Sequence, residues 1–174
     1  GKLWIQMPAT VDPNQMKVRI QNSSTAFQIN GSYVSIKSLQ FQGVVPVVAA
    51  GSYGIRYEGL TINEPGILRF SDKEQDYLQL AGLVVRAGAV VTHSVIDGCN
   101  GRCIDVAGDG ILVEHNFIRN GTRLGQYEGA ISIHGRNARI ERNWIENSGH
   151  DGIGFMAKAV EGAIVRRNWI LNSG

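Results

Sequence analysis

Short apolar segments recur along the chain, and each is followed by a small turn residue. In each segment two apolar positions flank one other residue, and Gly or Ala follows two positions later. The segments are Phe27-Gln-Ile29, Val47-Val-Ala49, Leu78-Gln-Leu80, Ile104-Asp-Val106, Ile131-Ser-Ile133 and Ile153-Gly-Phe155. Intervals of 20 to 31 residues separate the turn residues, which are Gly31, Gly51, Gly82, Gly108, Gly135 and Ala157. The alternation predicts β-strands, and a period of this length is typical of solenoids.

A second unit follows each turn and carries two apolar residues five positions apart. These pairs are Ile36 and Phe41, Tyr57 and Ile62, Val91 and Ile96, Val113 and Ile118, Ile140 and Ile145, and Val165 and Ile170. Each repeat therefore holds at least two strands. Strands this short bury an apolar face only when each coil stacks on the next.

Two columns of asparagine accompany the last three repeats. Asn116, Asn143 and Asn168 stand two positions before the second apolar residue, and Asn120, Asn147 and Asn172 follow four positions later. Parallel coils stack about 4.8 Å apart, so equivalent amides lie over one another and can donate and accept along the column. We interpret both columns as turn structure rather than as ligands.

The pattern predicts an all-β fold, a parallel β-helix solenoid of about six to seven coils. Residues 1–26 would form a lead-in or cap, and residues 27–174 the coils, with a surface excursion at 64–80. The chain ends at Gly174 in mid-pattern, so we expect the helix to be truncated at the C-terminus. Uncapped coils expose strand edges, which would allow edge-to-edge self-association.

The repeat resembles that of the right-handed parallel β-helix superfamily. It consists of an Ile-x-Ile strand, a turn and then the segment x-Ile-x-x-Asn-x-Ile-x-Asn-Ser-Gly, and it is clearest over residues 101–174. The opening Gly1-Lys-Leu-Trp-Ile-Gln-Met-Pro8, with Asp12-Pro-Asn14 after it, is similar to the segment that leads into the helix in large exported β-helix proteins of carbohydrate metabolism. That pectate-lyase-like superfamily includes pectate and alginate lyases, polygalacturonases, epimerases, glycosidases and noncatalytic surface proteins. The resemblance implies its carbohydrate-active branch, a polysaccharide or oligosaccharide partner, and a secreted or cell-surface location. The solenoid alone does not fix the reaction.

Charge and apolar content narrow the partners. The 17 basic and 15 acidic side chains are scattered, without a basic run, which argues against nucleic acid. No apolar run approaches the roughly 20 residues of a membrane span. The two cysteines, Cys99 and Cys103, are too few for a tetrahedral zinc site. They form either a small-loop disulfide or two free thiols.

Aligning the repeats by their turn residues gathers polar side chains on one outer face over three consecutive coils. They are Arg102, Asp105, Glu128, Ser132, His134, His150 and Asp151. Residues at the same distance from their turn residues form a column along the solenoid. In this alignment Val48 and Gln79 share the column of Asp105, and Ala81 shares the column of His134. The face would extend roughly 10 Å along the axis, about the dimension of a sugar subsite.

This mixture suits two kinds of carbohydrate chemistry. Glycoside hydrolysis needs two carboxyl groups, and the catalytic candidates are Asp105, Glu128, His134 and Asp151. Arg102, Ser132 and His150 are the substrate-binding candidates. A lyase or epimerase acting on uronic acids would instead use Arg102 to neutralise the carboxylate and His134 or His150 as the base. Three acids on adjacent coils slightly favour hydrolysis.

Other interpretations remain open at this point. The chain could be a noncatalytic β-helical surface or structural module, or part of an enzyme whose catalytic residues lie beyond Gly174. No cofactor is expected, although Asp97, Asp105 and Asp109 could form a calcium site, as acidic clusters do in lyases of this superfamily. The identity of any metal is unknown from the sequence.

Overall fold

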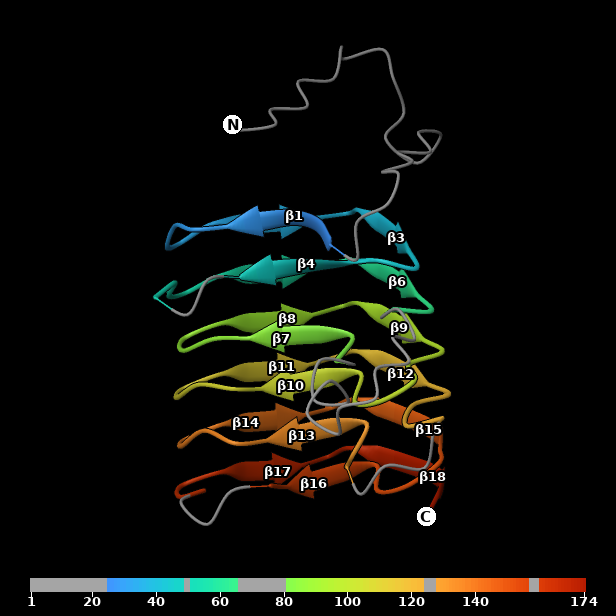
Figure 1. The fold of residues 1–174 in the computed structure, drawn as a ribbon. Helices are drawn as coiled ribbons and strands as arrows, with labels where there is room; N and C mark the ends of the chain where they lie inside the picture. Colours follow the sequence, from blue (N-terminus) through green and yellow to red (C-terminus); the bar gives the residue numbers. More distant parts are fainter. Residues whose placement is uncertain (1–24, 49–50, 66–80, 124–127, 157–159) are drawn as a thin grey trace, which may run out of the picture.

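The computed structural model describes residues 25–48, 51–65, 81–123, 128–156 and 160–174, and in this part of the chain the regular structure consists of short β-strands. The strands form flat coils stacked from the blue N-terminal end to the red C-terminal end (Figure 1). All strand pairs are parallel. The described chain is therefore a parallel β-helix, as predicted. It contains no helix long and apolar enough to cross a bilayer.

Each coil contributes one strand to each of three faces. Sheet 1 has the order β16-β13-β10-β7, and β1 and β4 form a separate pair. The bounds of these strands are β1 Thr25–Ile29, β4 Val45–Val48, β7 Leu83–Val85, β10 Ile104–Val106, β13 Ile131–Ile133 and β16 Ile153–Phe155.

Sheets 2 and 3 contain six strands each. Sheet 2 consists of β2 Ser35–Lys37, β5 Arg56–Glu58, β8 Val90–Thr92, β11 Leu112–Glu114, β14 Arg139–Glu141 and β17 Ile164–Arg166. Sheet 3 consists of β3 Gln40–Gln42, β6 Thr61–Asn63, β9 Val95–Asp97, β12 Phe117–Arg119, β15 Trp144–Ser148 and β18 Trp169–Ser173. The second sequence unit is thus two strands, which makes three strands in each coil.

The regular three-sheet solenoid is shorter than expected. Sheet 1 is continuous only from β7 to β16, and the β1–β4 pair is not hydrogen-bonded to it. All three sheets are therefore continuous over about four turns, and the expected six to seven coils are not supported. The number of coils expected from the sequence assumed that every apolar segment adds one coil. Only the backbone hydrogen bonds show which of these segments join a continuous sheet.

Two predicted strand alignments are wrong, one in sheet 1 and one in the β1–β4 pair. Leu83–Val85, not Leu78–Leu80, pairs with Ile104–Val106, which puts Val84 rather than Gln79 beside Asp105. By the same register Arg86, not Ala81, occupies the column of His134. Two neighbouring segments have the same apolar alternation, and hydrogen bonds from Gly82 and Leu83 to the loop before β10 select the second. Residues 66–80, most of the expected excursion, lie outside the described residues, as do residues 1–24 of the expected lead-in.

A second misalignment concerns β1 and β4. Gln28 pairs with Val47, one residue away from the expected Val48, because the register of this pair is irregular. The alternation of apolar residues does not reveal such a shift, since it is produced by the local course of the backbone.

The register predicted for sheets 2 and 3 is confirmed. The apolar residues five positions apart are the central, inward-facing residues of successive strands, and each pairs with its predicted counterpart. The column Ile62, Ile96, Ile118 and Ile145 is fully buried. Stacked β-branched side chains fill the narrow interior, which fits their preference for pleated, packed surfaces.

Single left-handed residues form the corners on both sides of sheet 3. The corner after sheet 3 holds Asn120, Asn147 and Asn172, with φ between 50° and 55°. Asparagine is among the few non-glycine residues that tolerate this conformation. The left-handed backbone at these corners therefore explains why asparagine recurs in the second column, in agreement with its interpretation as turn structure.

The first asparagine column forms a hydrogen-bonded ladder. Asn116 Nδ2 donates to Asn143 Oδ1, and Asn143 Nδ2 donates to Asn168 Oδ1, both at 3.0 Å. Each amide oxygen also accepts a backbone N–H from the preceding coil, at 3.0 Å from Asn116 and 2.9 Å from Asn143. Ser94 continues the column by donating its N–H to Asn116 Oδ1. The ladder fixes the spacing of the coils at this corner.

Candidate functional site

Four of the predicted site residues meet on the outer face of sheet 1. Arg102 lies in the loop before β10, Asp105 at the centre of β10, and Glu128 and His134 on either side of β13. Arg102 Nη1 lies 3.2 Å from Asp105 Oδ2, and Arg102 Nε lies 3.2 Å from Glu128 Oε2. His134 Nε2 lies 2.9 Å from Arg102 Nη1. We call these four residues the Arg102 cluster.

A disulfide holds the loop that carries the central arginine. Cys99 and Cys103 are bonded and fully buried, which decides between the two alternatives that the sequence left open. The carbonyl of Arg102, inside this closed loop, accepts the N–H of Gly82 at 2.8 Å. Only 5% of the Arg102 side chain is exposed. The guanidinium is therefore a fixed internal element of the cluster.

The contacts of His134 define its hydrogen-bonding state. Arginine has only donors, so the 2.9 Å contact requires His134 Nε2 to accept from Arg102. Asp105 Oδ1 lies 3.3 Å from the same Nε2 and is buried without a hydrogen bond. The same ring nitrogen thus lies between a guanidinium and a carboxylate.

The cluster is arranged differently from a two-carboxylate hydrolase site. Both carboxylate oxygens lie 3.2 Å from nitrogens of one planar guanidinium, so their separation is no more than about 9 Å, which is compatible with glycosidases. The guanidinium, however, lies between the carboxylates of Asp105 and Glu128, where a hydrolase would bind the glycosidic bond. Cleavage there would require Arg102 to move.

Three predicted site residues do not join the cluster. Ser132 is fully buried and donates its Oγ hydrogen to the carbonyl of Gly129. Its outward register position is covered by neighbouring groups. His150 Nδ1 lies 3.4 Å from Asp151 Oδ2, and Asp151 is 56% exposed. These two form a separate pair two coils along from Arg102.

A polar groove at the corner after sheet 3 encloses about 900 Å³. Its lining residues are Gln42, Asn63, Glu64, Asp97, Gly98, Arg119, Asn120, Gly121, Arg123, Asn147 and Gly149. They come from five successive coils, so the groove follows the solenoid axis for roughly 19 Å. Sequence reasoning missed it, although the glycines near the second asparagine column were a signal, because Gly98, Gly121 and Gly149 add no side chain to the lining.

Hydrogen bonds order the charged side chains of this axial groove. Asp97 accepts from Arg119 Nε at 2.8 Å and from Asn120 Nδ2 at 2.7 Å. Gln42 Nε2 donates to Glu64 Oε2 at 2.9 Å. These contacts hold amide, carboxylate and guanidinium groups in place along one surface. Such groups match the paired donors and acceptors of sugar hydroxyls.

The three acids considered for calcium are not brought together. Asp97 pairs with Arg119, Asp105 with Arg102, and the Asp109 carboxylate accepts the N–H of Arg136 at 2.8 Å. In the described ranges, no group of three His, Cys, Asp or Glu side chains is placed to hold a metal ion.

An aromatic column lies on the outer face of sheet 3. The rings of Trp144 and Trp169 are stacked 5.4 Å apart, and Phe117 follows at 6.5 Å from Trp144. Arg119 covers Phe117 at 5.6 Å. The two tryptophan rings stack face to face on adjacent coils, and we interpret this contact as stabilising the stack of coils.

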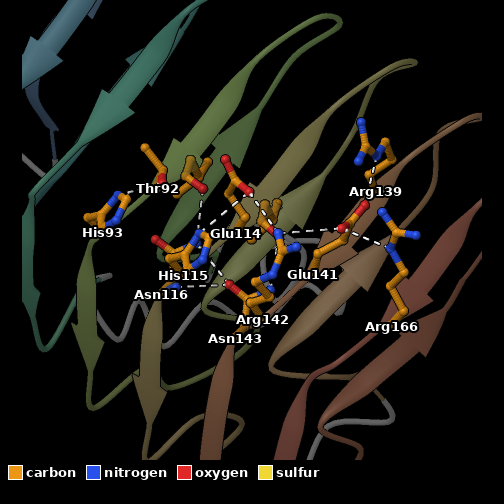
Figure 2. Close-up of polar contacts among 12 residues, drawn as sticks. Thr92, His93, Glu114, His115, Asn116, Arg139, Glu141, Arg142, Asn143 and Arg166 are labelled. Carbon is orange, nitrogen blue, oxygen red and sulfur yellow. Dashed lines mark hydrogen bonds and ion pairs between the residues drawn. The ribbon is translucent and has the colours of Figure 1, made fainter.

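A charged network covers the outer face of sheet 2 (Figure 2). Glu141 is only 1% exposed and pairs with Arg139 at 2.8 Å and Arg166 at 2.9 Å. His93 and His115 are exposed and stack 5.2 Å apart. The contacts link residues of adjacent coils, and we interpret this network as stabilising.

The ion pairs of Glu141 predict a pH dependence. The guanidinium groups of Arg166 and then Arg139 lower the pKa of Glu141 below its ordinary value. Ionised Glu141 therefore stabilises the fold above the unfolded-state pKa, and this contribution is lost as the pH falls through the lowered folded-state pKa. The difference in free energy of unfolding between wild type and Glu141→Gln should shrink in urea titrations from about pH 6 to about pH 3. A constant difference would contradict the assignment.

Comparison with known proteins identifies the family. A family model described as right-handed beta helix region matches residues 18–174. No curated protein and no solved structure matches the chain. The match covers most of the sequence and agrees with the stacked parallel coils. The chain belongs to the right-handed β-helix family.

Proposed function

We propose that this chain is the glycan-binding solenoid of a carbohydrate-active protein, with a polysaccharide lying along the axial groove. The observation that carries the proposal is the polar lining of the groove over five successive coils. A linear polymer with regularly repeated hydroxyl groups fits a surface whose own amides and charges repeat at each coil. The stacked strands keep these groups at fixed spacing without ligand.

A second candidate function is cleavage of the bound glycan at the Arg102 cluster. It is favoured by the convergence of Asp105, Glu128 and His134 on one buried guanidinium. Glycoside hydrolysis at the two carboxylates remains slightly ahead of elimination, because Arg102 is already matched by two acids and is not available for a substrate carboxylate. A noncatalytic role is the remaining alternative, supported by the position of Arg102 between the acids.

The disulfide supports a secreted or cell-surface location as part of this proposal. Disulfides persist in oxidising compartments and are rare in the reducing cytosol. The bond between Cys99 and Cys103 is fully buried beside the proposed sites. Two free thiols in the protein isolated from its own cells would contradict this location.

Binding tests the proposal through the groove asparagines. Asn120→Gly with Asn147→Gly removes two amides but keeps the left-handed backbone, since both residues have positive φ. We expect polysaccharide affinity, measured by calorimetry on hits from a glycan array, to fall about tenfold or more, as lost hydrogen bonds imply. Asn137→Gly, an exposed left-handed residue outside the groove, is the matched control. Unchanged affinity in the double variant would contradict groove binding.

Cleavage is tested separately from binding. Reducing ends and unsaturated products are followed on every polysaccharide that binds, with Asp105→Asn and Glu128→Gln as variants. Loss of reducing ends in both variants, without unsaturated product, would support hydrolysis. Unsaturated product in the wild type would identify elimination, and binding without either product would support the noncatalytic role.

A further inference from the structure

Two histidines stack at the corner between sheets 2 and 3 (Figure 2). His93 follows β8 and His115 follows β11, which are neighbouring strands of sheet 2. The centroids of the two rings lie 5.2 Å apart, and the ring planes differ by 8°. Both side chains are exposed. This stacked histidine pair therefore lies open to solvent, and the strands of sheet 3 separate it from the axial groove.

The backbone gives the two side chains the same direction. Both residues are left-handed, with φ of 51° at His93 and 53° at His115. This conformation is uncommon for a residue other than glycine, although histidine is among the types enriched in it. Because the two corners have the same conformation in paired coils, the rings leave the solenoid side by side. Two imidazoles are thus held next to each other without any ligand.

Each ring is held at its Nδ1 atom by the residue that precedes it. His93 Nδ1 lies 2.8 Å from Thr92 Oγ1, and His115 Nδ1 lies 3.5 Å from Glu114 Oε2. A carboxylate only accepts and a hydroxyl is able to accept, so both contacts fit a proton on Nδ1 and a lone pair on Nε2. Within the described residues, no hydrogen bond or ion pair involves the Nε2 atom of either ring.

We propose that His93 and His115 together bind a divalent transition-metal ion through their Nε2 atoms. Imidazole nitrogen suits Cu²⁺, Ni²⁺ and Zn²⁺, and metal-bound histidines usually place their other ring nitrogen against an oxygen, such as those of Thr92 and Glu114. Two nitrogens bound to one ion, each at about 2.1 Å, lie about 3 to 4 Å apart. The ring tips therefore tilt together by about 1 to 2 Å on binding, which exposed side chains allow.

The surroundings of the pair accommodate a cation. Glu114 lies beside His115, and Arg142, the corner residue of the next coil, lies 3.9 Å from both Glu114 and Glu141. These two acids offset the charge of Arg142. On the other side the corner residue is Gly59, which adds no side chain. Two protein nitrogens leave the remaining coordination positions of the ion open to water or to a donor from another molecule.

Calorimetry with Cu²⁺ and with Zn²⁺ on the untagged protein tests the pair. His93→Asn and His115→Asn each remove one imidazole and keep a residue that tolerates the left-handed backbone. The control His150→Asn removes a histidine from outside the pair. Because the second nitrogen binds intramolecularly, loss of either imidazole should weaken Cu²⁺ binding about 100-fold or more, whereas the control should keep the wild-type affinity. Wild type should bind Cu²⁺ more tightly than Zn²⁺.

Electron paramagnetic resonance of the Cu²⁺ complex provides a second readout. We expect coordination by two imidazole nitrogens in wild type and by one in each pair variant. Wild-type Cu²⁺ affinity retained in His93→Asn or in His115→Asn would overturn the inference, as would the absence of Cu²⁺ binding by folded wild type. Circular dichroism verifies the fold of each variant. Cu²⁺ binding is measured without glycan, so its failure is distinct from a failure of the proposed function.

Discussion

Replacing Arg102 with Met should cost about 3 to 5 kcal/mol of unfolding free energy, the penalty for removing one partner of a buried ion pair. The side chains of Asp105 and Glu128 are 13% and 15% exposed, and both rely on this guanidinium. Methionine keeps the aliphatic stem but leaves two carboxylates without a cation. Urea unfolding followed by circular dichroism measures the loss.

A matched control uses another ion pair of this solenoid. Arg119 lies 2.8 Å from Asp97, but its side chain is 44% exposed. Arg119→Met should therefore cost no more than about 1 kcal/mol, since solvent screens exposed pairs. Adding Asp105→Asn and Glu128→Gln to Arg102→Met should recover much of the lost stability. Equal losses for the Arg102 and Arg119 variants would contradict the central role of Arg102.

Replacing Asn143 with Ala should cost about 3 kcal/mol or more, because each buried group left without a partner costs about 1 to 3 kcal/mol. Asn143 Oδ1 accepts from the backbone N–H and the side chain of Asn116. Its Nδ2 donates to the carbonyl of Val113 and to Asn168 Oδ1. Alanine removes all four contacts from the corner of three successive coils. Chemical denaturation gives the value.

Asn147→Gly is the control from the second asparagine column. Asn147 is exposed, has φ 55° and accepts one side-chain hydrogen bond, from Asn172. Glycine keeps the left-handed corner, so the variant should stay within about 1 kcal/mol of wild type. A loss in Asn147→Gly as large as in Asn143→Ala would show that the two columns are not structurally distinct.

The repeat alone determined the register of sheets 2 and 3. The apolar centres are always five positions apart, with one left-handed corner residue between the strands. A fixed spacing leaves only one register, so Ile118 must lie between Ile96 and Ile145. Aligning the repeats by their turn residues also placed Arg102, Asp105, Glu128 and His134 on one face, because stacked coils bring nearby positions of successive repeats together.

Sheet 1 could not be aligned from the pattern throughout. The connection before β7 varies in length, and two neighbouring segments, Leu78–Leu80 and Leu83–Val85, show the same alternation. Alternation identifies which residues face inward but does not identify the strand to which each pairs. That choice depends on backbone hydrogen bonds from the next coil, which are long-range contacts.

Only the tertiary structure decided which charges meet and which surface stays open. The position of a residue in the repeat predicts the side of the strand on which its side chain lies, but it does not predict how deeply that side chain is buried. Ser132 was therefore placed on the outer face, whereas in the structure it is fully buried. Repeat positions could not show that the Arg102 guanidinium lies between two carboxylates, because that depends on the course of the disulfide-closed loop. The axial groove forms where residues at the corners after sheet 3 come together from five separate coils. The sequence by itself thus determined the right-handed solenoid and the register of two sheets, whose contacts repeat at fixed spacing. The charge pairing and the groove were decided by packing between coils, which follows no sequence period.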